Sequence, residues 1–131
     1  MNASELPFSE FVFAYTRAQA LADGVQIEVS NVAAEAGIRF PVFLTRAVFA
    51  NCVAVPPGVA CQDEAGRLWD IATSLRHAIR KARPGQDRLS FALYVRNEDR
   101  PARLVKLIAI CGALDIHDPR PAITIMTPTE D

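Results

Sequence analysis

The chain has few of the residues that build metal and redox sites. It contains three cysteines and two histidines in 131 residues, with no CxxC, HxxxH or HExxH spacing among them. Zinc sites depend on such spacings, so we expect no metal site and no cofactor. An odd number of separated cysteines is typical of reduced thiols rather than of a disulfide framework. We therefore expect a cytoplasmic protein.

Long apolar runs and glycine-rich loops are also missing. No stretch approaches the roughly 18 apolar residues of a membrane span, and no basic segment precedes an apolar one at the N-terminus, as in a secretory signal. The six glycines stand singly, so neither GxGxxG nor a phosphate-binding loop occurs. We expect no membrane association and no nucleotide-binding loop.

What remains is the composition of a single globular domain. Half of the residues are hydrophobic and 22% are charged, which is typical of a chain that buries one core. We expect one α+β domain over residues 1–131, with residues 1–10 as a loosely ordered tail.

Four segments carry helix signals: residues 15–23, 32–36, 46–53 and 62–83. Thr16 and Thr45 are expected N-caps of the first and third helices, and Ser30 or Asn31 of the second. The last segment is the longest, and Pro84 ends it because proline cannot continue a helix.

Four other segments carry strand signals: residues 25–29, 89–95, 104–111 and 122–126. The third is apolar on both faces, as a central strand would be. Gly112 is expected to end it, and a loop containing Pro119 and Pro121 is expected to cross to the last strand. The predicted architecture is short N-terminal helices and one long helix packed on a small, mainly antiparallel sheet that ends in a three-strand meander.

Charge is segregated along the chain although the formal net charge is only −1. Residues 71–106 hold nine basic and three acidic side chains, whereas the segments on either side are acidic. Such a basic segment attracts an anionic partner if its charges gather on one surface. The alternative is that the charges pair with acidic groups across the fold.

The long helix carries two stripes. One stripe is apolar and predicts the packing surface, because its residues recur at the spacing of one helix face: Leu68, Ile71, Leu75, Ile79 and Ala82. A second stripe beside them is aromatic and basic: Trp69, Arg76, Arg80 and Arg83. Arginines bind phosphate oxygens and an exposed indole stacks on bases, so these residues are our first candidate binding surface. The alternative is that they border the core, with their charged heads in water.

Arg39 and Arg46 form a second candidate. Arg39 precedes an extended Phe40–Pro41 pair, and Arg46 follows the expected N-cap Thr45. Both could approach the start of the third helix, where backbone N–H groups favour an anion. The alternative is a structural ion pair with Glu35 or Glu28.

Two groups of polar residues resemble a catalytic site and a metal site in composition. Asp70, Ser74 and His77 share one helix face, but Asp70 and His77 are two turns, or roughly 10 Å, apart along the axis. A working triad needs hydrogen-bonded contacts in series. The acidic run at residues 115–118 is more typical of a turn than of a metal loop. We therefore assign no catalytic residue.

Short blocks of the sequence resemble a family of small uncharacterised bacterial proteins, a domain of unknown function carried on plasmids and integrated conjugative elements. The resemblance extends over nearly the whole chain, from Tyr15 to the end, through short blocks in the same order: Tyr15–Ala20, Asp23–Gly24, Ala36–Val42, Thr45–Ala47, Gln62–Asp70 and Ile123–Met126. The chain departs from the family in the Pro56–Gly58 loop. The resemblance implies a bacterial cytoplasm and a mobile-element setting, but no active site.

These observations lead to one expectation and two alternatives. We expect a non-enzymatic accessory protein of a bacterial mobile element that binds a nucleic acid or a protein partner. The first alternative is an enzyme whose site assembles from dispersed residues such as Arg39, Arg46, Asp70 and His117. The second is a homo-oligomer, a homodimer in the simplest case, because the strand at residues 104–111 has more apolar surface than short helices cover.

Overall fold

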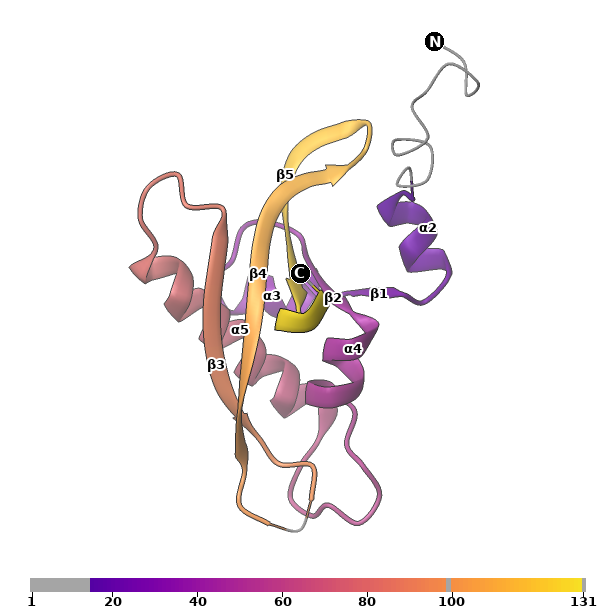
Figure 1. Cartoon of the computed structure of the whole chain (residues 1–131), viewed down its shortest axis with the longest axis vertical. Helices are drawn as coiled ribbons and strands as arrows, with labels where there is room; N and C mark the ends of the chain where they lie inside the picture. The colour runs from indigo at the N-terminus through magenta and orange to yellow at the C-terminus, as the bar shows by residue number, and fades with distance from the viewer. Residues whose placement is uncertain (1–14, 99, 131) are drawn as a thin grey trace.

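The computed structural model describes residues 15–98 and 100–130, and within them it is an α+β fold around one five-stranded sheet (Figure 1). The expected tail at residues 1–10 lies outside the described residues. The strands are β1 (Gln26–Glu28), β2 (Val42–Thr45), β3 (Arg88–Val95), β4 (Arg103–Asp115) and β5 (Asp118–Met126). The helices are α2 (Arg17–Ala22), α3 (Ser30–Glu35), α4 (Arg46–Val48), its π-helical continuation η2 (Phe49–Val53), α5 (Glu64–Lys81) and the 3-10 turn η3 (Pro128–Glu130).

The sheet order is β1-β2-β5-β4-β3, and only the β2–β5 pair is parallel. Strands β3, β4 and β5 form the antiparallel meander that the sequence predicts. Strand β4 is an interior strand between β3 and β5, but the middle strand of the sheet is β5. The expected central strand covered on both faces is therefore not found at residues 104–111, because Leu104 of β4 is 55% exposed. The predicted fold class is nevertheless confirmed.

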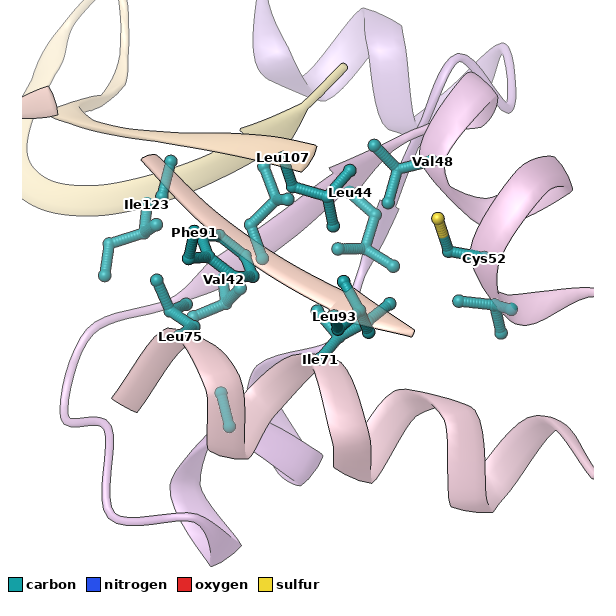
Figure 2. Close-up of a cluster of buried hydrophobic side chains, with 14 of the residues drawn as sticks. Val42, Leu44, Val48, Cys52, Ile71, Leu75, Phe91, Leu93, Leu107 and Ile123 are labelled. Atoms are coloured by element: carbon teal, nitrogen blue, oxygen red, sulfur yellow. The ribbon is translucent and has the colours of Figure 1, made fainter. Parts of the chain in front are cut away.

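The core lies between α5 and one face of the sheet (Figure 2). Ile71 and Leu75 of α5 point toward the strands, where Phe91 and Leu93 of β3 meet them. The burial of β3 alternates strictly, with Phe91, Leu93 and Val95 buried and the residues between them exposed. The apolar face of α5, set by the helical period of 3.6 residues, therefore packs against the apolar face of β3, set by the strand period of 2.

Two of the expected N-caps are present. Thr16 accepts a hydrogen bond from Gln19 N at 3.0 Å, and the Gln19 side chain accepts one from Thr16 N at 2.9 Å, which completes a capping box. Thr45 accepts one from Val48 N at 3.3 Å at the start of α4. Both α2 and α5 are shorter than predicted. Helix α2 lacks two residues at its N-terminus and one at its C-terminus, and α5 lacks two at each end.

The cap predicted for the second helix is wrong. Helix α3 begins at Ser30 rather than Val32, and its N-cap Val29 makes no side-chain cap bond. The Ser30 hydroxyl instead donates to Glu28 at 2.7 Å and accepts from Val42 N at 3.1 Å. Its polar group is used to join this turn to β2, so it is not available to the helix.

The prediction for the last hairpin is also wrong. Gly112 does not end β4, which continues to Asp115, and Pro119 and Pro121 belong to β5 rather than to a crossing loop. Because β2 pairs only with residues 123–125, the start of β5 has a free edge, where a proline is tolerated. The hairpin extends past Arg88, the first residue of β3 (Figure 1).

The two faces of the sheet are covered unequally. Helices α5 and α3 cover the core face, and α2 lies over the β1–β2 side of the opposite face, which we call the far face. On β3 and β4 the far face is largely open: Tyr94 is 69% exposed and Leu104, directly opposite it, is 55% exposed. This open surface is one consequence of the short N-terminal helices.

Candidate functional site

Helix α5 holds the first candidate surface in a fixed orientation. Its N-cap Asp63 accepts a hydrogen bond from Gly66 N at 2.5 Å, and it ends before Pro84. Ile71 and Leu75 are 2% and 0% exposed, so the helix cannot rotate about its axis without losing core contacts. The direction in which its outer residues point is therefore set by the core.

Of the four residues on the flank, three remain exposed. Trp69 is 43% exposed, and Arg80 and Arg83 are exposed at the C-terminal end. Arg76 is half-buried, and its Nη1 donates to the carbonyl of Ala36 at 2.8 Å. This contact satisfies a C-terminal carbonyl of α3 and joins the two helices. Arg76 thus has a structural partner, and its role in binding stays a prediction.

Arg39 lies near the same end of α5. It is exposed, and the next residue, Phe40, lines a cleft together with Ile79 and Ala82 of the helix and its C-cap. Among residues 15–98 and 100–130, no hydrogen bond or ion pair engages the Arg39 guanidinium. The structural ion pair with Glu35 that we considered from the sequence does not form.

Arg46 does not belong to this group. It begins α4 at the opposite end of β2, and the four strand residues alone separate it from Arg39 by roughly 13 Å of extended backbone. Its charge acts instead on Tyr15 beside α2, where it opposes the effect of Asp23 on the pKa of the phenol. The structure therefore does not bring Arg39 and Arg46 to one loop.

The basic groups at the C-terminal end of α5 are Arg80, Lys81 and Arg83, all exposed. Within the described residues, the ion pairs join other arginines: Arg100 to Glu98 at 3.8 Å and Arg120 to Asp118 at 2.6 Å. Cations at this end also complement the partial negative charge of the helix C-terminus. The arrangement leaves several positive groups, together with Arg39, without a carboxylate partner in the described structure.

Sequence reasoning missed Arg67, which is 5% exposed and is the buried charged residue of the described chain. Its Nη1 donates to the carbonyl of Ala54 at 3.0 Å and to Asn97 Oδ1 at 2.8 Å, and its Nη2 donates to the carbonyl of Arg96. Nε donates to Gln62 at 3.2 Å. Among the residues that the structure describes, no carboxylate takes part, and the acceptors are all neutral oxygens.

The spacing of Arg67 from the apolar residues of α5 could have predicted its burial. It precedes Ile71 and Leu75 by four and eight residues, so it lies on the core side of the helix. Its contacts join α5 to the loop after η2 and to the end of β3. Arg67 is therefore a structural residue that orders the segment between η2 and α5.

Sequence reasoning also missed Arg17, which anchors α2 to the far face. Its guanidinium carbon lies 4.1 Å from the centroid of the Phe43 ring, in a cation–π contact. Nη1 donates to Thr124 Oγ1 at 3.0 Å, and Nε donates to the carbonyl of Leu114 at 2.5 Å. Burial lowers the pKa of Arg17, and the nearby Asp115 carboxylate opposes this change.

Asp115 completes that anchor. Its carboxylate accepts hydrogen bonds from Ile116 N at 2.8 Å, from Arg17 N at 2.9 Å and from Ala18 N at 3.1 Å. These backbone hydrogen bonds hold the pKa of Asp115 below its ordinary value, and the bond from Ile116 N has the largest effect. Residues 116 and 117 form the two-residue hairpin turn, as the turn interpretation of this segment predicted. In the described part of the chain, no three His, Cys, Asp or Glu side chains gather as metal ligands.

The dispersed residues of the enzyme alternative lie on separate elements. Asp70 is on the outer side of α5, His117 at the tip of the β4–β5 hairpin, Arg46 at the start of α4 and Arg39 before β2. None of the four lines the apolar cleft beside α5 or the polar cleft around Arg17.

Comparison with protein-family models, curated proteins and solved structures finds no match to this chain. Across the described residues, no helix is both long and apolar enough to span a membrane.

Proposed function

We propose that this protein is a non-enzymatic accessory protein that binds nucleic acid through the C-terminal end of α5. The interface residues are Arg80 and Arg83, with Arg39 beside them and Trp69 further along the same flank. We also propose a mobile-element setting, and its support is the resemblance of the short sequence blocks alone.

One observation supports the proposal above the others. Arg39, Arg80 and Arg83 are exposed near one end of α5, and no side chain of the described residues pairs with their guanidinium groups. Unpaired guanidinium groups bind phosphate oxygens in bidentate geometry without first breaking an internal ion pair. Arg80 lies on α5, Arg83 directly follows it and Arg39 lies in the segment before β2. Trp69, with 43% of its surface exposed, adds a flat ring for base stacking.

The test is a salt titration of binding to duplex and single-stranded DNA. Each neutralised phosphate contributes a slope of about −0.9 for a duplex and about −0.7 for a single strand in a plot of log K against log salt. In the double variant Arg80→Ala/Arg83→Ala, the slope should become shallower by up to about two units, with weaker binding to all sequences.

The matched control is Arg100→Ala/Arg120→Ala, which removes the same charge from two exposed ion pairs on the β3–β4 and β4–β5 hairpins, away from the C-terminal end of α5. It should retain the slope of the wild-type protein. If both double variants lose affinity equally, net charge rather than this surface governs binding. If the wild-type protein shows no salt-dependent binding, the proposed function is wrong.

A second candidate function, a homodimer, is favoured by a different observation. Tyr94 and Leu104 lie opposite each other on the far face and are both exposed, which is unusual for adjacent large apolar side chains. A second copy of the chain stacked on this face would bury both. Light scattering should then give a dimer mass that returns to the monomer mass in Tyr94→Ser/Leu104→Ser; a monomer at high concentration contradicts this candidate.

A further inference from the structure

An apolar cleft of about 120 Å³ lies between the C-terminal half of α5 and the sheet. Leu75, fully buried, and Ile79 line it from the helix, and Cys111 lines it from β4. Phe40, 43% exposed, stands at the outer side. Apart from Gln86 and Asp87, all the lining residues are apolar.

The two polar residues of the cleft differ in whether their side chains already form hydrogen bonds within the protein. The Gln86 side chain accepts from Arg83 N at 3.1 Å and donates to the carbonyl of Arg88 at 3.0 Å, so it holds the turn after α5. The carbonyl of Asp87 accepts from Cys111 N at 2.8 Å, which places Asp87 beside the cleft. Within the described residues, the Asp87 carboxylate itself has no hydrogen bond and no ion pair.

Size and charge together define the ligand. An apolar cavity of about 150 Å³ binds benzene, so this cleft matches one six-membered ring or a short hydrocarbon chain. An apolar lining with a small number of polar groups is the usual composition of a small-molecule site, and here the polar residues are Gln86 and Asp87. The free carboxylate selects a ligand that carries a positive charge or a hydrogen-bond donor.

We propose that this cleft is a binding site for a small apolar molecule with one ammonium or hydroxyl group, which is oriented by the Asp87 carboxylate. The site is separate from the arginine surface, and the proposal does not depend on nucleic-acid binding.

Cys111 supplies the measurement, because it lines the cleft and is partly accessible. In a Cys61→Ser background the exposed thiol is gone and Cys52 is buried, so a neutral pyridyl disulfide should report on Cys111. The probes are benzylamine, phenol and benzoate at neutral pH. At ten times its Kd, a probe that occupies the cleft lowers the reaction rate about tenfold.

We expect benzylamine to protect best, phenol less, and benzoate not at all. Asp87→Asn should weaken protection by benzylamine and leave protection by phenol nearly unchanged. Replacing the C-cap residue by Ala82→Leu should abolish protection by filling the cleft, whereas Ala65→Leu, at an exposed position in α5, should not. Melting curves show whether each variant is folded, and the Asp87→Asn comparison still tests the proposal if Ala82→Leu does not fold.

Three results would overturn the proposal: no probe protects Cys111, benzoate protects as well as benzylamine, or Asp87→Asn leaves the order of the probes unchanged. Because the assay contains no nucleic acid, its failure is distinct from a failure of the DNA-binding proposal.

Discussion

Gly37 lies directly over the guanidinium of Arg76. A Cβ atom placed on Gly37 would be 1.7 Å from Nη1 of Arg76, which at the same time donates to the carbonyl of Ala36. The φ angle of Gly37 is +90°, in the region that other residues rarely adopt. Glycine is thus needed here for two reasons, its backbone conformation and the space for the arginine that joins α3 to α5.

The two reasons can be separated by comparing two glycines. Gly85 has a φ of +80° but open space around its absent Cβ. Gly85→Ala should lower the free energy of unfolding by about 1–2 kcal/mol from backbone strain alone, and Gly37→Ala should lower it further. Urea unfolding measures both. In an Arg76→Ala background, the cost of Gly37→Ala should fall to that of Gly85→Ala; an unchanged cost would show that Arg76 does not constrain Gly37.

Replacing Arg67 should be the most damaging change to a charged residue in the described chain. Arg67→Met keeps much of the side-chain volume but leaves the carbonyls of Ala54 and Arg96 and the amide oxygen of Asn97 without this donor. We expect a loss of about 3 kcal/mol in urea unfolding. Arg67→Lys should recover little because one ammonium cannot reach all these oxygens. The exposed control Arg80→Met should stay within about 0.5 kcal/mol of the wild-type protein; a similar loss in both variants would contradict the assignment.

Attachment of α2 should depend on pH through Asp115. Its folded-state pKa is lowered by hydrogen bonds from Ile116, Arg17 and Ala18, so its contribution to stability is present above the unfolded value near 4. This contribution is lost as the pH falls through the lower folded value. Hydrogen exchange of the amides of Arg17 and Ala18 should therefore quicken at acid pH relative to that of α5.

The variant Asp115→Asn should show the same faster exchange in α2 already at pH 7. Asp118→Asn is the control, because the Asp118 carboxylate, whose pKa is also low, binds Arg120 within the hairpin instead of α2. Unchanged protection of α2 in Asp115→Asn would contradict the role of Asp115 as its anchor.

The three thiols should react at separate rates. Cys61 is exposed and should react first with Ellman's reagent, Cys111 more slowly, and Cys52 only on unfolding. Burial raises the pKa of the Cys52 thiol, which further disfavours the reactive thiolate. Cys61→Ser should remove the fast phase and leave the others. Rapid reaction of Cys52 in the native protein would contradict the burial of η2 in the core.

Local signals in the sequence were sufficient for much of the fold. The alternation of residues 89–95 predicted the buried and exposed positions of β3, because a strand has period 2 whatever its neighbours are. The N-caps Thr16 and Thr45 and the helical stripe of α5 are equally local. Strand β2 was not predicted: residues 42–44 are all buried and show no alternation, and the strand exists through its pairing with β5, far along the chain.

For the candidate site, the sequence placed Trp69, Arg76 and Arg80 on one side of α5, because helical periodicity alone sets the relative direction of side chains on a single helix. Arg83 was predicted on the same stripe, but α5 ends at Lys81 and its C-cap Ala82 is extended, so helical periodicity does not set the direction of Arg83. Tertiary structure decided which of these groups are free. The backbone of α3 engages Arg76, a loop brings Arg39 near the end of α5, and β2 separates Arg39 from Arg46. The same holds for Arg67 and Arg17, whose acceptors come from segments distant in the chain. The sequence by itself determined the elements and their faces, since these follow from contacts between near neighbours. Which charges remain available to a partner depends on contacts between distant segments, and only the folded chain decides those.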